Sequence, residues 1–375
     1  MPWGDAGISK ELFLSNGINP WGGGGFPVSV PIQQTGILKQ LRLLETATPT
    51  FVPGTGSIAA DVLGPWDVFN QIYVAPNQQA PVVQVSGYAL YLINLIKKIE
   101  GEAAGAPDVS AISVSNAEAA GDVFGARATS GTAPWDFFLD VPISQRVASL
   151  GGDIGYWPLQ NPAMQLQAQF TPNSGSTGSP FNAYSTTAGQ APYLVTGNAT
   201  VTLTNPTVEL IRDLYSVPAS QADYPPFQLV STWIEEAPQG VNVNGATSFQ
   251  WMATPLSGLL ARLIVFIYDG ASNNGVAASK LAQSNALQLT YDANTAKFAE
   301  SASAALARQR DYYRFDLPQG VYCWDLLGRN QTLQDVLNTN TTGNIKAIVS
   351  LSSALGGANS AAKIIKQMIS PLEVK

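Results

Sequence analysis

Several stretches of the chain alternate between apolar and polar residues with a repeat of two. The clearest is residues 164–170, where apolar side chains take one face and glutamines the other. Residues 199–204, 287–291 and 345–351 follow the same rule, the last with one exception at Ile348. A repeat of two places successive side chains on opposite faces of a strand. These segments predict strands with one face on a core and the other in solvent or against a neighbour.

Two longer stretches, residues 88–96 and 259–268, are apolar without alternation, and the second contains Arg262. Both are too short to span a bilayer. Continuous apolar runs are typical of central strands that are buried on both faces. The pattern therefore predicts two such strands.

Two segments have apolar residues at helical spacing. The first is residues 294–313, with Asp292 or Asn294 as its N-cap. The second lies near the C-terminus, where a stripe runs beside Lys363 and Lys366. Its members are Ile364, Ile365, Met368, Ile369 and Leu372. This stripe docks either on its own domain or on a neighbouring subunit or lipid, and the sequence leaves both open.

The order of elements recurs in the two halves of the chain: an aromatic strand carrying an aspartate is followed by an alternating strand. Two tandem β-domains are the simplest account, with a boundary in the proline-marked residues 217–226. We predict an N-terminal arm over 1–35, a first domain over 36–217, a second over 218–355, and an amphipathic C-terminal arm over 356–375. The N-terminal arm is expected to be irregular, with one short helical turn at 9–14 and a glycine joint at 22–25.

Composition supports an all-β fold with short strands and many turns. The 375 residues suffice for two cores, and the 34 glycines and 25 prolines are spread along the chain. Charged residues make up only 12%, about half the usual share. This favours a surface covered by copies of the same protein; adaptation to a salty or acidic medium is the alternative. The net charge of −7 argues against a broad nucleic-acid-binding surface.

Candidate chemistry is sparse. The chain has no histidine, which excludes Ser-His-Asp and Cys-His catalysis and ordinary zinc sites. No Walker loop is present, and the single cysteine, Cys323, lies in an aromatic strand, where a buried structural thiol is expected. We therefore predict no catalytic, cofactor-binding or metal-binding residues. The first 25 residues lack a signal-peptide pattern, so a soluble protein synthesised in a cytoplasm is expected.

Carboxylate chemistry remains as an alternative, because a glycoside hydrolase needs only two acidic residues across a cleft. Glu235 and Glu236 are adjacent, so on a strand they point to opposite faces. Asp136 and Asp140 share a face but lie roughly 13 Å apart by strand rise. Neither pair suits this reaction without a partner from another strand.

Three stretches carry a resemblance to a known family. They are Leu-Gly-Pro-Trp-Asp-Val-Phe-Asn-Gln-Ile-Tyr-Val at 63–74, Val-Ser-Gly-Tyr-Ala-Leu-Tyr-Leu-Ile-Asn at 85–94, and Phe-Asp-Leu-Pro-Gln-Gly-Val-Tyr-Cys-Trp-Asp at 315–325. The last follows a basic helix-like segment containing Arg308, Arg310 and Arg314. Their order and spacing over residues 36–351 resemble the major capsid proteins of tailless, membrane-containing phages of the tectivirus type.

The resemblance implies two tandem eight-stranded jelly rolls, with a few helices in loops and at the termini. It also implies a non-enzymatic homotrimer of pseudo-hexameric shape that tiles an icosahedral virion shell, around an inner membrane. The partners would be neighbouring capsomers and minor capsid proteins, with no sequence-specific nucleic-acid binding. We expect residues 1–25 and 361–375 to lie on the inner, membrane-facing side. Another viral β-sandwich protein, a vertex or receptor-binding component, is the runner-up.

Overall fold

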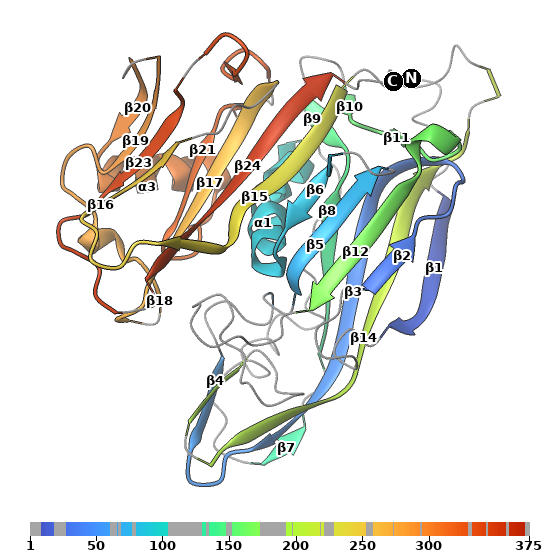
Figure 1. Cartoon of the computed structure of the whole chain (residues 1–375), viewed down its shortest axis with the longest axis horizontal. Coiled ribbons are helices and arrows are strands. Elements are labelled where there is room, and N and C mark those ends of the chain that lie inside the picture. The colour runs from blue at the N-terminus through green and yellow to red at the C-terminus, as the bar shows by residue number, and fades with distance from the viewer. Residues whose placement is uncertain are drawn as a thin grey trace. The chain divides into compact units, whose positions relative to one another are not determined.

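In the computed structural model most of the described residues belong to β-strands, which are divided between two compact units (Figure 1). The first unit comprises residues 1–146, 153–234 and 372–375, and the second comprises residues 147–152 and 235–371. The described residues are 9–18, 28–60, 66, 69–76, 80–103, 130–132, 135–147, 152–172, 193–196, 198–217, 219–220, 229–252, 258–272, 274–292, 295–328, 332–342, 344–357 and 360–371.

The first unit contains most of the strands of the N-terminal half and one α-helix. The elements along this half are β1 (Ser9–Ile18), β2 (Val28–Pro31), β3 (Ile37–Val52), β4 (Ser57–Ala60), β5 (Phe69–Pro76), β6 (Val83–Val85), α1 (Gly87–Ala103), β7 (Gly131–Thr132), β8 (Trp135–Pro142), β9 (Gln145–Val147), β10 (Gly152–Ile154), β11 (Trp157–Pro158), the 3₁₀ turn η3 (Pro162–Met164), β12 (Leu166–Pro172), β13 (Tyr193–Thr196) and β14 (Thr200–Tyr215).

Two larger sheets organise this unit. One has the order β1-β14-β3-β11, with β7 and β8 also paired to β3. The other has the order β6-β5-β12-β2, and the first residues of β15 (Leu229–Asn242) run parallel to β6. Alternation appears as predicted: β12 buries Leu166, Ala168 and Phe170, whereas Gln167 is exposed. The prediction of a strand in residues 164–170 is therefore confirmed from Leu166 onward.

Helix α1 occupies the apolar run 88–96, so the predicted central strand there is wrong. Tyr88, Leu92 and Ile96 are all buried, and Asn94 is buried with them. A short apolar run fits a buried helix as well as a buried strand, because periodicity is lost when nearly every position is covered. The Asn94 amide donates to the carbonyl of Asp140 at 2.9 Å and accepts from its backbone N–H at 2.9 Å. The helix is thereby fastened to the edge of β8.

The N-terminal segment contains strands where an irregular arm was predicted. Residues Ser9–Ile18 form β1, which is antiparallel to β14, and β2 is antiparallel to β12. The short helical turn predicted at 9–14 is therefore wrong. The glycine joint at 22–25 lies outside the described residues. Most of the predicted domain boundary at 217–226 does so too, and that boundary stays a prediction.

The second unit is built from two facing sheets. After β15 come β16 (Ser248–Met252), β17 (Leu259–Asp269), β18 (Asn274–Gly275), the 3₁₀ turn η6 (Ala278–Lys280), β19 (Leu287–Tyr291), β20 (Thr295–Glu300), α3 (Ala302–Tyr313), β21 (Val321–Asp325), β22 (Leu337–Asn338), β23 (Lys346–Ser350) and β24 (Ala361–Pro371). In one sheet β17 pairs with β24 along one side and with β18, β21 and β22 along the other. The second sheet has the order β16-β23-β19-β20.

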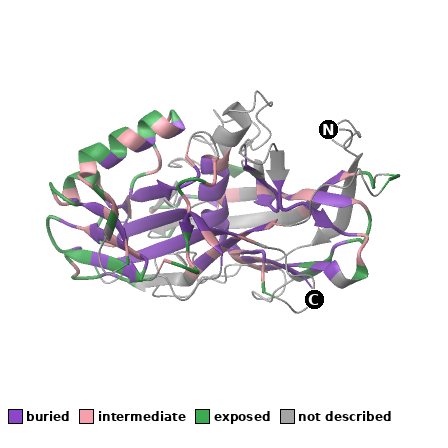
Figure 2. Ribbon diagram, turned by 90° about the horizontal axis from the view of Figure 1, so that it is seen from above, coloured by how far each residue is buried: buried purple, intermediate pink, exposed green. Residues whose placement is uncertain are grey.

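A single apolar cluster lies between these sheets. Leu263, Val265 and Trp324 come from the first sheet and Trp251 and Val349 from the second. Strand β17 is the central strand predicted for residues 259–268, and ten of its eleven residues in a row, from Leu260 to Asp269, are buried (Figure 2). The predictions of strands at 287–291 and 345–351 are confirmed by β19 and β23.

Both helical predictions in this half need correction. The first helix begins at Ala302 rather than near residue 294, and Ser301 is its N-cap; residues Thr295–Glu300 form β20. The C-terminal stripe is the strand β24, buried from Ala361 to Ile369 between β15 and β17. Residues 361–371 are therefore neither a helix nor an amphipathic arm.

Candidate functional site

The helix–turn–strand segment α3–β21, which carries the family resemblance, is shaped by specific backbone requirements. The Ser301 hydroxyl accepts from the backbone N–H of Ala304, which caps the helix. Arg314 ends it in the left-handed conformation, with φ of 62°. Gly320 then follows with φ of 83°, and a Cβ at this position would lie 2.5 Å from the carbonyl oxygen of Ile267. Glycine is thus the residue that lets this turn close onto β17.

A buried polar network lies beneath this turn. Arg262 on β17 faces Asp325 on β21, and its Nε donates to Asp325 Oδ2 at 2.7 Å. A second nitrogen of Arg262 donates to Gln367 on β24 at 3.0 Å. The Tyr313 hydroxyl, at the end of α3, lies 3.3 Å from the same Asp325 oxygen. The Leu327 backbone N–H donates to Oδ1 at 3.1 Å, so this carboxylate receives hydrogen bonds from three directions.

Cys323 belongs to the same cluster and is buried, as predicted. The Tyr313 hydroxyl lies 3.1 Å from its Sγ. Burial raises the pKa of the Cys323 thiol to about 12 and also raises the pKa of Tyr313. A thiol with so high a pKa is almost entirely protonated near neutral pH, and it is therefore a poor nucleophile.

The basic residues of α3 engage in ion pairs. Arg308 makes a two-pronged pair with Glu300 on β20, at 2.7 and 2.9 Å. Arg310 makes a similar exposed pair with Asp316. These contacts tie the helix to the strand before it and to the turn after it. The segment α3–β21, which carries the resemblance, accordingly has a structural role: it connects the helix to the neighbouring strands.

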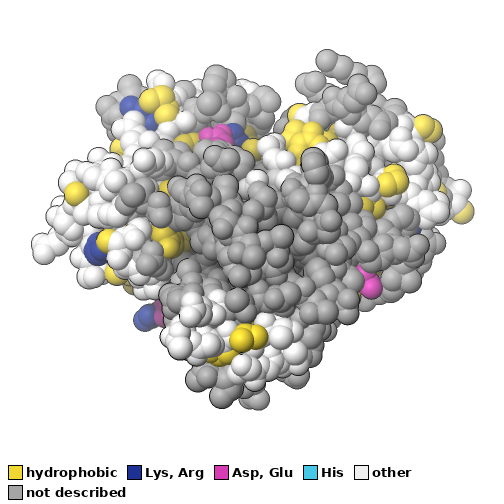
Figure 3. All heavy atoms as spheres, turned by 60° about the horizontal axis from the view of Figure 1, so that its bottom comes forward, with side chains coloured by type: hydrophobic (Ala, Val, Ile, Leu, Met, Phe, Trp, Pro, Cys, Tyr) yellow, Lys and Arg dark blue, Asp and Glu magenta, His cyan; other side chains and the backbone are white. Residues whose placement is uncertain are grey.

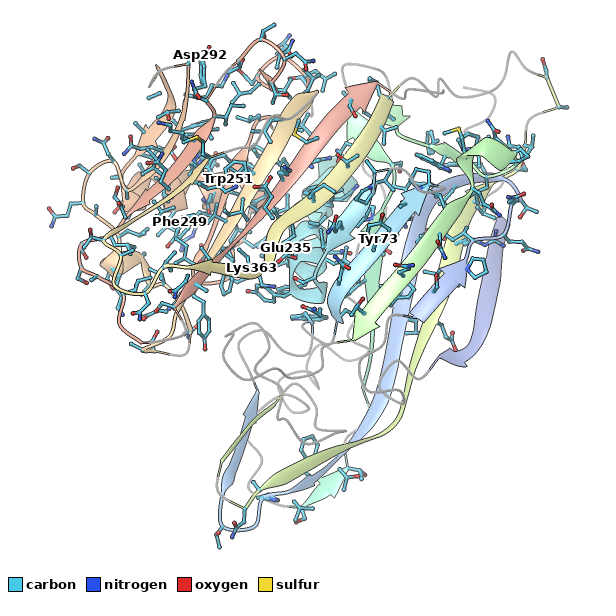
Figure 4. The ribbon with its side chains drawn as sticks, in the orientation of Figure 1. Tyr73, Glu235, Phe249, Trp251, Asp292 and Lys363 are labelled. Atoms are coloured by element: carbon cyan, nitrogen blue, oxygen red, sulfur yellow. The ribbon has the colours of Figure 1, made fainter. Side chains whose placement is uncertain are left out.

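The carboxylates weighed for glycoside hydrolysis also lie in ion pairs. Glu235 on β15 lies 3.0 Å from Lys363 on β24, and both side chains are buried (Figure 4). Glu236 contacts Lys366 on β24 and accepts from the indole N–H of Trp251. Adjacent residues on β15 thus engage two different lysines on β24. This matches the expectation that Glu235 and Glu236 point to opposite faces.

Asp140 lies on β8, directly opposite Arg42 on β3, and its Oδ1 is 3.1 Å from Arg42 Nε. Arg42 also lies 3.2 Å from Asp213 on β14. Desolvation raises the pKa of Asp140 to about 7, even though Arg42 acts in the opposite direction. Asp136 is on the same strand, opposite Thr46, but its side chain lies outside the described part. The structure therefore places Asp140 with Asp213, a residue that sequence reasoning did not connect with it.

Within the described ranges, no cluster of three or more Cys, Asp or Glu side chains is arranged to hold a metal ion. No helix in that part of the chain combines the length and the apolar character needed to cross a membrane. On the face in Figure 3 the described charged side chains are scattered and do not gather in one patch.

The fold matches known structures over nearly its whole length. The STIV MCP aligns with a TM-score of 0.60 and 13% identity, covering 97% of this chain and 96% of that one. The major capsid protein P2 from bacteriophage PM2 aligns with a TM-score of 0.52 and 8% identity, covering 98% of each chain. The chain has a double jelly-roll fold. The Faustovirus major capsid protein aligns with it at a TM-score of 0.57 and 9% identity, covering 99% of this chain and 91% of that one. No family model and no curated protein matches the sequence of this double jelly roll.

For the polar clusters around Arg262 and around Asp140 in this double jelly roll, the sequence pointed to some members but not to the others. Arg262 was visible as the only charge inside an apolar run, and Cys323 and Asp325 as part of the aromatic strand. Their partner Gln367 lies 105 residues from Arg262 and gave no local signal. Arg42 and Asp213 were missed for the same reason, because only strand pairing brings them together.

Proposed function

We propose that this protein is a major capsid protein that forms the shell of an icosahedral virion. The observation that carries the proposal is the end-to-end likeness to major capsid proteins, which extends over 96–98% of both chains for the STIV MCP and for P2 of bacteriophage PM2. A likeness confined to one jelly roll would fit many unrelated β-sandwich proteins. A likeness that extends over both jelly rolls and nearly all of both chains favours the capsid role.

The proposed assembly unit is a homotrimer. Three chains with two similar units each present six similar bodies around a threefold axis, which gives a pseudo-hexameric outline suited to tiling. A charged fraction of only 12% fits a chain whose surface is largely covered by copies of itself. We expect each permanent interface to bury upwards of roughly 2,000 Å².

The proposed partners are neighbouring capsomers and minor capsid proteins, and the proposed location is the virion, around an inner membrane, after synthesis in the host cytoplasm. The role is structural rather than catalytic. In support, Glu235, Glu236 and Asp140 each lie in an ion pair with a basic side chain.

Native mass spectrometry of the purified protein tests the trimer, and negative-stain imaging of the same sample tests its outline. We expect a single species of three chains with a hexagonal projection. A protein that stays monomeric at every concentration, or a trimer of plainly triangular outline, would contradict the proposal.

A further inference from the structure

Three adjacent strands of the first unit bring two carboxylates to one arginine. Arg42 on β3 lies directly opposite Asp140 on β8, and Gln40 on β3 lies opposite Asp213 on β14. Arg42 Nε is 3.1 Å from Asp140 Oδ1, and Arg42 Nη2 is 3.2 Å from Asp213 Oδ2. Gln40 donates to the same Asp213 oxygen at 2.8 Å. Asp140 and Asp213 are thus both paired with the guanidinium of Arg42, and the further donor to Asp213, Gln40, carries no charge.

Little water reaches this cluster. The side chains of Asp140, Arg42 and Asp213 are 13%, 18% and 8% exposed. Asp213 Oδ1 is buried and makes no hydrogen bond to any described residue. Two carboxylates that share a poorly solvated site disfavour simultaneous ionisation, because each charge raises the cost of the other.

The charged groups around Asp140 come from three elements. Strand β3 supplies Arg42 and Lys39, strand β14 supplies Asp213, and helix α1 supplies Lys97. Lys97 donates to the Ser144 carbonyl at 3.0 Å. The three cations oppose desolvation and Asp213, and the balance leaves the pKa of Asp140 at about 7.

The backbone of Asp140 is also the place where α1 is attached. Asn94 exchanges two hydrogen bonds with the Asp140 backbone N–H and carbonyl, each of 2.9 Å. A change in the charge of the Asp140 side chain therefore acts at the joint between helix and sheet. The Asn94 amide has no titratable group, so it does not respond to pH itself.

We propose that Asp140 is a proton-binding site through which pH controls how firmly α1 is held against the β8–β3–β14 sheet. While Asp140 carries its proton, Arg42 serves Asp213 alone and α1 is held more firmly. As pH rises toward neutral and beyond, Asp140 releases that proton, two carboxylates compete for Arg42, and α1 opens more often. This device is a property of the single chain and does not depend on the proposed capsid role.

The direction of the effect follows from proton linkage. The pKa of Asp140 in the folded unit, about 7, lies above its ordinary value of 3.8. The closed state therefore holds a proton that the opened segment releases. The resulting stabilisation is complete below the ordinary value and is lost as pH rises through the folded one. From about pH 6 to about pH 8, the opening constant of α1 should rise about tenfold and then level off.

Hydrogen–deuterium exchange of the α1 amides, corrected for intrinsic exchange rates, measures this opening on the full-length protein. Infrared spectroscopy of the protonated carboxyl band measures the proton itself. The wild type should show both the tenfold rise and a carboxyl band that disappears over the same pH range. Asp140→Asn should lose both, because asparagine cannot ionise. The control Asp316→Asn removes an exposed acid in the other unit and should behave as the wild type.

Asp213→Asn provides a second arm that does not rely on the folding of Asp140→Asn. Removing the neighbouring negative charge should move the loss of the carboxyl band to lower pH, an effect that a purely structural role would not produce. The proposal is overturned if the wild type lacks the band at about pH 6, if Asp140→Asn retains it, or if its midpoint is the same in Asp213→Asn.

Discussion

In each unit an arginine faces an aspartate directly across an antiparallel ladder. The pair is Arg262 and Asp325 in the second unit and Arg42 and Asp140 in the first. The second-unit pair is almost sealed, with side chains 1% and 2% exposed and a separation of 2.7 Å. The first-unit pair is partly exposed, with side chains 18% and 13% exposed, and is 3.1 Å apart.

The two pairs occupy similar positions between strands, but the groups that surround them differ. Asp325 is also approached by the Tyr313 hydroxyl and receives the Leu327 backbone N–H, whereas Arg42 divides its guanidinium between Asp140 and Asp213. An arginine–aspartate pair across two strands therefore stabilises the fold where further donors bond to the aspartate, as at Asp325. It becomes a titratable site where one arginine is shared by two aspartates, as at Asp140. Surroundings, more than the pair itself, decide which outcome occurs.

The largest expected effect is in the sealed pair. Arg262→Met leaves the carboxylate of Asp325 buried without its cation, and we expect a loss of about 3–5 kcal/mol in the free energy of unfolding, measured by chemical denaturation. Adding Asp325→Leu to Arg262→Met removes the stranded charge and should restore most of that loss. The double variant being as unstable as the single one would show that packing, rather than charge, dominates this site.

A smaller effect is expected in the shared pair. Arg42→Met should cost about 2 kcal/mol at about pH 8, where Asp140 is ionised, and less at about pH 6, where Asp140 can stay protonated. The pH dependence of the difference, rather than its size, separates the two arginines. The same loss at both pH values would argue that Asp140 does not take up a proton in response.

The smallest perturbation tests how tightly the second-unit cluster is closed. Cys323 is buried, and its pKa is raised to about 12 by that burial, so a thiol reagent should label it only after unfolding. Ser303→Cys places a thiol on the exposed face of α3 and should label at once in the folded protein. Rapid labelling of Cys323 in the wild type would mean that the α3–β21 joint opens frequently.

Local patterns in the sequence were enough to locate the alternating strands but not to classify the fully buried segments. Residues 259–268 and 88–96 look alike as apolar runs, yet one is β17 and the other is α1. Run 88–96 contains Asn94, whose amide is hydrogen-bonded to the backbone of Asp140 on strand β8, and nothing in the local sequence indicates that partner.

The C-terminal strand misled sequence reasoning for a related reason. Lys363 and Lys366 were read as the polar border of a helix, but on β24 they are buried beside Glu235 and Glu236. Because β24 is covered on both faces, most of its residues are apolar, and the two lysines in buried ion pairs lie three positions apart. This spacing resembles the repeat of an amphipathic helix. Their partners lie some 130 residues away, so only the strand order could have revealed them.

Asn94 also determines where a sheet stops. Strand β8 pairs with β3 along one side, and within the described residues no strand pairs with its other side at Asp140, where the Asn94 amide occupies both backbone groups. An unpaired backbone edge invites the edge of another molecule, which is a hazard for any protein that accumulates at high density. The Asn94 side-chain amide blocks this edge, because a strand from another molecule would have to displace it before it could pair with β8.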